Sequence, residues 1–195
     1  MKRAFDLIMA IVVLVLFLPL FLIVGLLIIM ESKGGIFFKQ ERIGKDLIPF
    51  KILKFRTMHV NAEAKGKLTV GSKDSRITKI GFWIRKYKID ELPQFINVAK
   101  GEMSIVGPRP EVSKYVDLYS NIQKKVLSIK PGITDYASLK YFEENKLLGE
   151  SLNPEETYVK EIMPEKLKIN LEYLEKNSFK NDLTIIWETF LRIIS

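Results

Sequence analysis

Cysteine is absent from this chain of 195 residues, and histidine occurs only once, at His59. Without cysteine there can be no disulfide, no thiolate zinc site and no cysteine nucleophile. A single histidine cannot build a multi-histidine metal site, and it argues against a Ser-His-Asp triad. Any metal would therefore have to be a hard ion with oxygen ligands, which points to Mg²⁺.

The glycine patterns of P-loops and dinucleotide-binding folds are also missing, so a nucleotide would have to be held in another way. Acidic residues are in deficit, and the net charge is +8. This surplus favours a polyanionic partner, such as nucleic acid, anionic lipid or a phosphorylated substrate, although it also serves solubility. The length suffices for one domain with its own core and an appendage.

Charge is missing altogether between Leu7 and Met30. This apolar run is long enough to cross a bilayer core, which requires about 20 helical residues. Its length, and the lack of a small-x-small cleavage site after it, argue against a removable signal peptide. The run is therefore expected to be a membrane-embedded segment.

Both flanks of the apolar run are positive, because Lys2 and Arg3 precede it and further cations follow from Lys33 to Arg56. Positive flanks favour the cytoplasmic side, so the two ends compete for the same face of the membrane. Pro19 lies in the middle, where it removes a backbone hydrogen bond and bends a helix. These features favour a re-entrant helix broken near Pro19, and a kinked span is the alternative.

The rest of the chain is predicted to form a mostly helical α+β domain. A β-hairpin is expected over residues 36–57, with its turn at 44–46, and a loop or lid over 61–76. Helices are expected over residues 78–88, 90–100, 111–127 and 155–176, with the last one kinked or split at Pro164.

The segment 182–194 carries one broad apolar stripe, formed by Leu183, Ile186, Trp187, Phe190, Leu191 and Ile194. The pattern predicts an amphipathic helix with an interfacial tryptophan, which could lie flat on a membrane. A helix packed in the protein core fits the pattern equally well.

Two adjacent carboxylates, Asp90 and Glu91, precede Pro93. Proline is tolerated in the first turn of a helix, so Asp90 fits the N-cap and Glu91 the first helical position. Capping alone would account for the aspartate and contributes about 1 kcal/mol. The same location would keep Asp90 ionised as a nucleophile, and the two carboxylates could hold Mg²⁺ against a substrate phosphate.

Arg109 is stiffened by a proline on either side, Pro108 and Pro110. A guanidinium held in this way can present its fork to phosphate oxygens at a reduced entropic cost. The basic pocket could be completed by Lys54, Arg56 and Arg85. An ordinary solvated strand face explains the first two equally well, because residues two apart on a strand share one face.

These motifs resemble the signature of bacterial polyprenyl-phosphate phosphoglycosyl transferases, the monotopic sugar transferases. The central block is Asp-Glu-Leu-Pro-Gln-Phe-Ile-Asn-Val at 90–98, followed by Gly-Glu-Met-Ser-Ile-Val-Gly-Pro-Arg-Pro at 101–110. Further matches run in order through residues 2–6, 40–44, 54–58 and 130–134. The resemblance covers nearly the whole chain, which is similar in size to the minimal catalytic unit of that family.

The resemblance implies a specific reaction. Such enzymes move a phospho-sugar from a UDP-sugar to undecaprenyl phosphate with Mg²⁺ and release UMP, as the first membrane step of glycoconjugate synthesis. By this likeness Asp90 attacks the sugar-linked phosphate to give a covalent aspartyl phospho-sugar, and Glu91 assists through the metal or as a proton acceptor. Substrate contacts would come from Lys54, Arg56, Arg85, Pro108, Arg109 and Pro110.

The resemblance also implies an arrangement at the bacterial inner membrane. Residues 1–30 would form the re-entrant membrane-embedded helix, and residues 31–195 a compact catalytic domain on the cytoplasmic face, with amphipathic interfacial helices that include 182–194. The lipid bilayer is then a partner and nucleic acid is not. Downstream glycosyltransferases are expected partners, and a homodimer remains open.

Two positions depart from the pattern of many family members. The first is Leu18-Pro19, where others carry a serine whose hydroxyl could satisfy a carbonyl freed at the bend. The second is Asp135-Tyr136-Ala137-Ser138, where others continue with Gly-Trp-Ala-Gln. If that loop touches the donor, the identity of the sugar does not transfer from those relatives.

A competing interpretation is a membrane-anchored basic scaffold without catalysis, which binds anionic lipid or nucleic acid. It accounts for the charge of +8 and for the apolar segments at both ends. It does not account for the ordered Asp-Glu and Pro-Arg-Pro block.

Overall fold

The computed structural model describes residues 1–60, 62 and 74–194. The described part is mostly helical and contains a short antiparallel hairpin, as the sequence predicts. The loop or lid expected over 61–76 lies outside the described residues, except for Ala62 and the last three positions. The α+β class is therefore confirmed.

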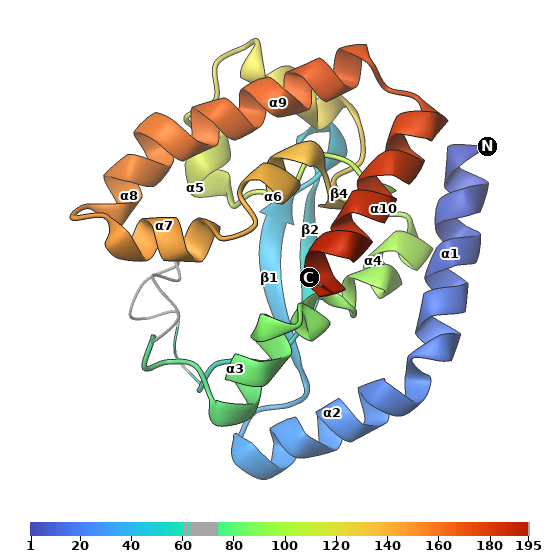
Figure 1. Cartoon of the computed structure of the whole chain (residues 1–195), viewed down its shortest axis with the longest axis vertical. Helices are drawn as coiled ribbons and strands as arrows, with labels where there is room; N and C mark the ends of the chain where they lie inside the picture. Colours follow the sequence, from blue (N-terminus) through green and yellow to red (C-terminus); the bar gives the residue numbers. More distant parts are fainter. Residues whose placement is uncertain (61, 63–73, 195) are drawn as a thin grey trace.

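Helices α1 (Lys2–Leu16) and α2 (Leu18–Glu31) form a bent pair along one side and the foot of the molecule (Figure 1). They meet at Phe17, and the bend between them is 61°. Pro19 lies in the first turn of α2. It has no N–H to donate and its ring would crowd the carbonyl of Val15, so α1 cannot continue unbroken through this position. The break expected near Pro19 is present, just ahead of the proline.

In the described part of the chain, no helix alone is long and apolar enough to cross a membrane. The bent pair of α1 and α2 meets that requirement when the two helices are taken together. Many of their apolar side chains are exposed: Ile8, Ile11, Val12, Val15, Leu16, Phe17, Leu18, Leu22, Ile23, Leu26, Leu27, Ile29 and Met30.

The start of the helix pair is fastened to the rest of the protein by polar contacts. The Arg3 guanidinium donates to the carbonyl of Val98 at 2.6 Å, near the end of α4 (Gln94–Lys100). The buried Asp6 carboxylate accepts a hydrogen bond from the Ser104 hydroxyl at 2.8 Å. These contacts satisfy buried polar groups, so they hold α1 firmly in place.

The far end of the pair is fastened to another helix. The Glu31 carboxylate accepts from the backbone N–H groups of Lys79 and Ile80, at 2.7 and 2.9 Å. These groups lie in the first turn of α3 (Lys79–Lys86), where backbone donors have no partner within the helix. Both ends of the apolar pair are therefore bonded to the same body of protein.

The predicted hairpin is formed by β1 (Phe37–Ile43) and β2 (Pro49–Phe55), which pair antiparallel in the middle of the molecule (Figure 1). A short 3₁₀ segment, η1 (Lys45–Leu47), makes the turn. As predicted for a strand, Lys54 and Phe55 take opposite faces. Phe55 is buried against α2 and α3, while Lys54 faces the cavity described below.

A second, two-stranded sheet was not expected from the sequence. Strands β3 (Ser104–Val106) and β4 (Gly132–Thr134) pair in parallel, and the backbones of Gly107 and Gly132 cross there. A Cβ atom on Gly132 would lie 2.1 Å from the backbone nitrogen of Gly107, so only glycine fits. The Gly-Pro-Arg-Pro and Pro-Gly-Ile-Thr motifs meet at this crossing.

The helix expected over 111–127 is wrong. Only α5 (Ser113–Val116) and a 3₁₀ segment, η4 (Gln123–Ser128), are helical there. Tyr115 and Val126 are nevertheless buried in one core. The apolar residues of this segment are therefore buried without forming a continuous helix. In α3, which lies within the helix predicted over 78–88, Ile84 is buried whereas the adjacent Trp83 is half exposed.

A chain of short helices leads from β4 to the long helix at the top of Figure 1. They are α6 (Tyr136–Lys140), α7 (Glu144–Glu150), α8 (Pro154–Thr157), the π-helical turn η5 (Tyr158–Ile162) and α9 (Met163–Glu175). The interruption predicted at Pro164, a kink or a split, takes the form of the π turn, which ends just before α9, and the proline stands in the first turn of α9.

Helix α10 (Phe179–Ile194) contacts α1 near the start of both helices, where the rings of Phe5 and Phe179 meet edge to face. It packs through Asp182 and Ile185, which are 2% and 0% exposed. Asp182 accepts hydrogen bonds from the Tyr173 hydroxyl and the Lys2 ammonium, each at 2.5 Å. Most of the predicted apolar stripe is exposed, including Trp187 at 60%. The stripe is therefore not the face that packs in the core.

Candidate active site

A cavity of about 500 Å³ lies between the hairpin, α10 and the bend of the helix pair. This volume is in the range of small-molecule sites. Its charged lining comprises Arg42, Lys54, Arg85, Lys88, Asp90, Glu91, Arg109, Glu111, Glu144 and Lys166. Its apolar lining includes Val13, Phe17, Phe95, Ile105, Ile133, Ile186, Phe190 and Ile193. The cavity thus combines a strongly charged surface with side chains from the apolar helices.

Asp90 lies in a 3₁₀ turn, η3 (Ile89–Glu91). The prediction that Asp90 caps the following helix is therefore wrong. Because Pro93 lacks an N–H, it occupies the capping position itself, and α4 begins at Gln94. Just before the turn, Lys88 has a φ of 55°, a left-handed conformation that is costly for a residue with a Cβ atom. This backbone places both Lys88 and Asp90 in the lining of the cavity.

Glu91 is bonded to two cations. The Lys54 ammonium donates to Glu91 Oε1 at 2.7 Å, and the Arg109 guanidinium reaches both carboxylate oxygens, with the contact to Oε2 at 3.3 Å. The three residues come from β2, from η3 and from the loop after β3. The predicted basic residues Lys54 and Arg109 are therefore brought together, and Glu91 is what joins them.

The pKa values of the two adjacent carboxylates are shifted in opposite directions. Burial alone would raise the pKa of Glu91, but the charges and hydrogen bonds of Arg109 and Lys54 outweigh it and hold the pKa well below its usual value. Burial raises the pKa of Asp90 above its usual value, although Lys54 opposes the shift. Different pKa values for two neighbouring carboxyl groups are typical of groups with different tasks.

The expectation that a helix terminus keeps Asp90 ionised is wrong in its cause. Asp90 caps no helix, and burial raises its pKa. The charges that favour its ionised form are those of Lys54, Arg85 and Lys88. Asp90 makes no hydrogen bond or ion pair with the described residues, in contrast to Glu91. It is the carboxylate that remains available to a ligand in the described part of the cavity.

The loop that carries Arg109 is held through its backbone. The Asp135 carboxylate accepts from the Arg109 N–H at 3.0 Å, and the Arg42 guanidinium donates to the carbonyl of Pro110 at 3.1 Å. The carbonyl of Pro108 accepts from Gly132 N–H at 3.0 Å. Arg109 is thus oriented by backbone bonds on both sides, and the guanidinium is free to point at Glu91.

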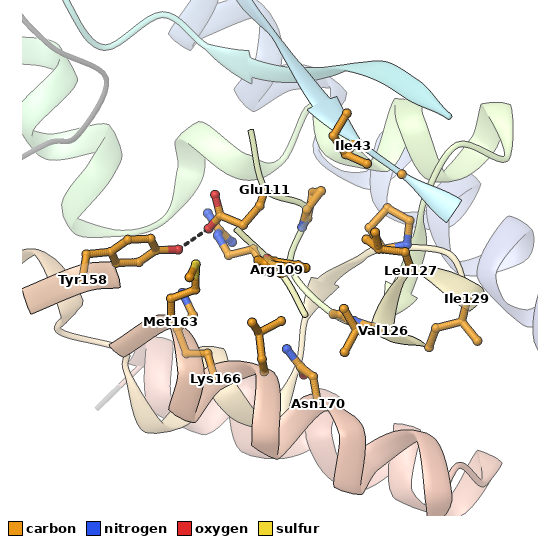
Figure 2. A pocket seen from close by; sticks show the side chains of 16 residues that line it. Ile43, Arg109, Glu111, Val126, Leu127, Ile129, Tyr158, Met163, Lys166 and Asn170 are labelled. Carbon is orange, nitrogen blue, oxygen red and sulfur yellow. Dashed lines mark hydrogen bonds between the residues drawn. The ribbon is translucent and has the colours of Figure 1, made fainter. Parts of the chain in front are cut away.

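Figure 2 shows a smaller cavity behind this loop, of about 30 Å³, lined by residues of the Arg109 loop, η4 and α9. The Tyr158 hydroxyl donates to Glu111 there, and Lys166 and Asn170 reach toward the loop from α9. The volume is that of one water molecule. The small cavity therefore belongs to the packing behind the loop and is no substrate site.

Three predicted substrate-binding residues do not line the large cavity in the described structure. Arg56 donates to the carbonyl of Gly35 at 3.0 Å instead. Pro108 and Pro110 line the small cavity behind Arg109 and brace the loop. Arg85 does line the large cavity, as predicted. Among the cations of the lining, Lys54, Arg85, Lys88 and Arg109 lower the pKa of Asp90 or of Glu91 through their charges.

Several charged residues of the lining were not found from the sequence. Lys88 stands two residues before Asp90, but nothing in the spacing marks its left-handed backbone. Arg42 and Glu111 lie far apart in the chain and pair at 3.4 Å only because β1 passes the Arg109 loop. Arg42 belongs to the segment 40–44 that resembles the family, and this resemblance was the signal from which its place in the site could have been predicted.

The fit of Mg²⁺ to these residues is partial. In the described part of the chain, no group of three acidic or histidine side chains could hold a metal ion. Mg²⁺ at phosphate sites is usually held by one or two carboxylates together with substrate oxygens. Asp90 fits that role, whereas both oxygens of Glu91 are already bonded to cations. The predicted metal pair thus reduces to one carboxylate.

The fold and the site together define a charged cavity at the bend of an apolar helix pair, in which one carboxylate, unbonded among the described residues, lies among cations. The sequence profile of the bacterial sugar transferase family matches residues 1–195, and the chain belongs to that family. The resemblance seen in its motifs is therefore confirmed.

Curated relatives are about one third identical to the chain over the residues that align with it. A UDP-N-acetylgalactosamine-undecaprenyl-phosphate N-acetylgalactosaminephosphotransferase of Aeromonas hydrophila is 34% identical over 199 residues, which covers 100% of this chain and 44% of that protein. A UDP-glucose:undecaprenyl-phosphate glucose-1-phosphate transferase of Escherichia coli is 35% identical over 195 residues, or 98% of this chain and 40% of that protein.

A third relative is closer to this chain in length. It is a UDP-glucose:undecaprenyl-phosphate glucose-1-phosphate transferase of Caulobacter vibrioides, 34% identical over 191 residues, covering 96% of this chain and 67% of that protein. The chain spans only about two fifths of the first two relatives. The sugars named for these relatives differ, N-acetylgalactosamine in one and glucose in the others, so family membership does not fix the donor.

Proposed function

We propose that this protein transfers a phospho-sugar from a UDP-sugar to undecaprenyl phosphate and releases UMP, through a covalent intermediate on Asp90. The observation that carries the proposal is the environment of this carboxylate. Asp90 is buried, without a bonded partner among the described residues, and it faces the same cavity as Lys54, Arg85, Lys88 and Arg109. A nucleophile for a phosphate ester needs this combination of a free carboxylate and fixed cations.

The reaction proceeds in two displacements at one phosphorus atom. First, a carboxylate oxygen of Asp90 attacks the sugar-linked phosphorus, and the bond from that phosphorus to the bridging oxygen breaks. UMP leaves with the bridging oxygen and its electron pair. Second, an oxygen of undecaprenyl phosphate attacks the same phosphorus, and the bond to Asp90 breaks. The products are a lipid diphosphate sugar and the regenerated carboxylate.

The cations perform the electrostatic part of the reaction. Arg109 and Lys54 are pre-positioned by Glu91, so little reorganisation is required when the donor phosphates enter. The depressed pKa of Glu91 makes it a weak proton acceptor. We therefore assign Glu91 to the positioning of these two cations rather than to proton transfer.

Mg²⁺ is the metal that we propose for the reaction. It would be held by the oxygens of the donor diphosphate and by the Asp90 carboxylate, and it would withdraw charge from the phosphate that is transferred. Lys54 and Arg109 keep their ion pairs with Glu91. Both cations would face the transferred phosphate from the wall of the cavity.

We further propose that the chain works at the cytoplasmic face of the bacterial inner membrane, with α1 and α2 as a re-entrant pair. Support comes from the two ends of the pair, since Arg3 and Glu31 are both bonded to the same body of protein. The exposed stripe of α10 would lie along the membrane surface, because its apolar side chains are not covered by the protein. Val13 and Phe17 lie in the membrane-embedded segment and also line the cavity, so the cavity would open close to the lipid acceptor.

The decisive test is the change of Asp90 to Asn. Asparagine has nearly the same shape but is no nucleophile, so Asp90→Asn is expected to abolish UMP release from UDP-sugars supplied with undecaprenyl phosphate and Mg²⁺. Radiolabelled sugar should remain on denatured wild-type protein after incubation with donor alone, and not on the variant. Asp117→Asn serves as the control, because Asp117 is exposed and lies outside the cavity lining. Full activity of Asp90→Asn would refute the assignment.

A further inference from the structure

One buried carboxylate joins the Arg109 loop to the turn that begins α6. Asp135 is 0% exposed, and its two oxygens take different partners. Oδ2 accepts from the Arg109 N–H at 3.0 Å, and Oδ1 accepts from the Ser138 N–H at 2.5 Å. The backbone N–H groups of Arg109 and Ser138 are therefore bonded to the two oxygens of the same carboxylate, which holds them close together.

Ser138 has a hydroxyl that finds no partner in the described structure. Its Oγ atom is buried and makes no hydrogen bond, although the residue lines the same cavity as Asp90 and Arg109. Thr134, the neighbouring hydroxyl of the lining, is by contrast bonded to Thr189 at 2.7 Å. A buried polar group without a partner costs about 1 to 3 kcal/mol. Because Ser138 lines the cavity, a ligand bound there is a candidate partner for this hydroxyl.

The turn that carries Ser138 is fixed by the residue three positions before it. Asp135 supplies the carboxylate that ties this turn to the Arg109 loop. The position of Ser138 beside the Arg109 backbone therefore depends on this buried carboxylate.

We propose that the Ser138 hydroxyl hydrogen-bonds the sugar of the donor and contributes to the choice of sugar. This inference rests on the proposed function. Arg109 faces the phosphate site, and the Asp135 carboxylate fixes Ser138 beside the Arg109 backbone. The sugar is the part of the donor bonded directly to the transferred phosphate. A neutral hydroxyl is suited to sugar hydroxyl or acetamido groups, which are themselves neutral donors and acceptors.

The test compares donors rather than single rates. UMP release is measured with UDP-glucose, UDP-galactose, UDP-N-acetylglucosamine and UDP-N-acetylgalactosamine, for the wild type, Ser138→Ala and Ser138→Gln. In Ser138→Ala, the ratio of kcat/KM between the best and the next-best donor is expected to fall about tenfold, the usual value of one hydrogen bond to a substrate. Ser138→Gln is expected to change the order of the donors, because the longer amide fills the space beside the sugar.

Folding is followed in the same samples. Ser138→Ala removes a hydroxyl that has no partner among the described residues, so the thermal midpoint of the variant is expected to equal or exceed that of the wild type. Ser113→Ala is the matched control, because Ser113 is exposed and lies outside the cavity lining, and its donor ratios should equal those of the wild type.

The outcomes separate this inference from the proposed function. An unchanged donor ratio in both Ser138 variants, with Asp90-dependent turnover by the wild type, overturns the sugar contact alone. An equal loss for all four donors also overturns it, because a contact with the uridine or the phosphates would have that effect. If the wild type releases UMP from none of the donors, the proposed function fails and this inference fails with it.

Discussion

Arg109 and Asp135 are joined through the backbone and not through their charges. The Asp135 carboxylate accepts from the Arg109 N–H at 3.0 Å, while the guanidinium of Arg109 pairs with Glu91. One arginine therefore has its main chain fixed by one carboxylate and its side chain by another. This double fixation places the cation in the cavity before any ligand arrives, which is the structural condition for electrostatic pre-organisation.

The change Asp135→Asn should destabilise the protein. An amide can accept from only one of the two N–H groups that the carboxylate now serves, and its own NH₂ would face the other one. The free energy of unfolding is expected to fall by about 1 to 3 kcal/mol, as measured by urea denaturation. The exposed Asp117→Asn should change it by less than about 0.5 kcal/mol. A loss no larger than that of this control would mean that the buried bonds are of little importance.

The change Glu91→Gln should weaken both stability and activity. It removes the negative charge between Lys54 and Arg109, and breaking a buried ion pair on one side costs about 3 to 5 kcal/mol. UMP release should fall as well, because the two cations lose their common anchor. If the variant kept full turnover and stability, Glu91 would have no positioning role.

The stabilising effect of Glu91 should depend on pH with a definite sign. Its folded pKa is depressed below the usual 4.5, so its contribution is fully present above that value. The contribution is lost as the pH falls through the depressed folded pKa. The stability difference between wild type and Glu91→Gln should therefore be constant near neutral pH and shrink at pH values below 4.5. Urea titrations at several pH values measure this difference.

The activity should lose its nucleophile at a higher pH than an ordinary aspartate would predict. Burial raises the pKa of Asp90, and only the ionised carboxylate attacks phosphorus. As the pH falls, kcat/KM is expected to decline through a pKa above the usual aspartate value of 3.8. The pH profile of UMP release in the stable range locates this limb. A limb at or below 3.8 would contradict the burial effect.

Both ends of the α1–α2 pair should lie on the same side of the membrane. Arg3 is bonded to α4 and Glu31 to α3, which belong to one body of protein. Because the chain contains no cysteine, single cysteines at Lys2 and at Lys33 can be labelled without interference. An impermeant maleimide added to sealed inverted vesicles should label both. Labelling from opposite sides would refute the re-entrant arrangement and favour a kinked span.

The local elements were largely predictable from the sequence. The turn at 44–46 indicated the hairpin, and Pro19 indicated the break in the apolar helix, because these signals act within a few residues. Helix α10 was also predicted, but the sequence could not decide which side would pack. The structure buries Ile185, outside the predicted stripe, because Asp182 on the same side is bonded to Lys2 and Tyr173.

The site was predicted by residue type but not by geometry. Asp90, Glu91, Lys54, Arg85 and Arg109 were all expected, and the cavity contains them all. Arg56 was expected with them, yet it turns away to the carbonyl of Gly35. Spacing along a strand assigns a face but not a partner. The partner depends on the loop that happens to lie beside that face in the folded protein.

By itself, the sequence determined that this protein has an apolar, positively flanked amino terminus, and that acidic and basic residues are grouped in motifs of one enzyme family. These are properties of neighbouring residues, and they follow from composition and short spacing. Only the tertiary structure decided that Glu91 is bonded to cations while Asp90 has no bonded partner among the described residues, and that Asp135 ties Ser138 to Arg109. Such contacts join segments distant in the chain, and their energies depend on burial, which arises only when those segments pack together.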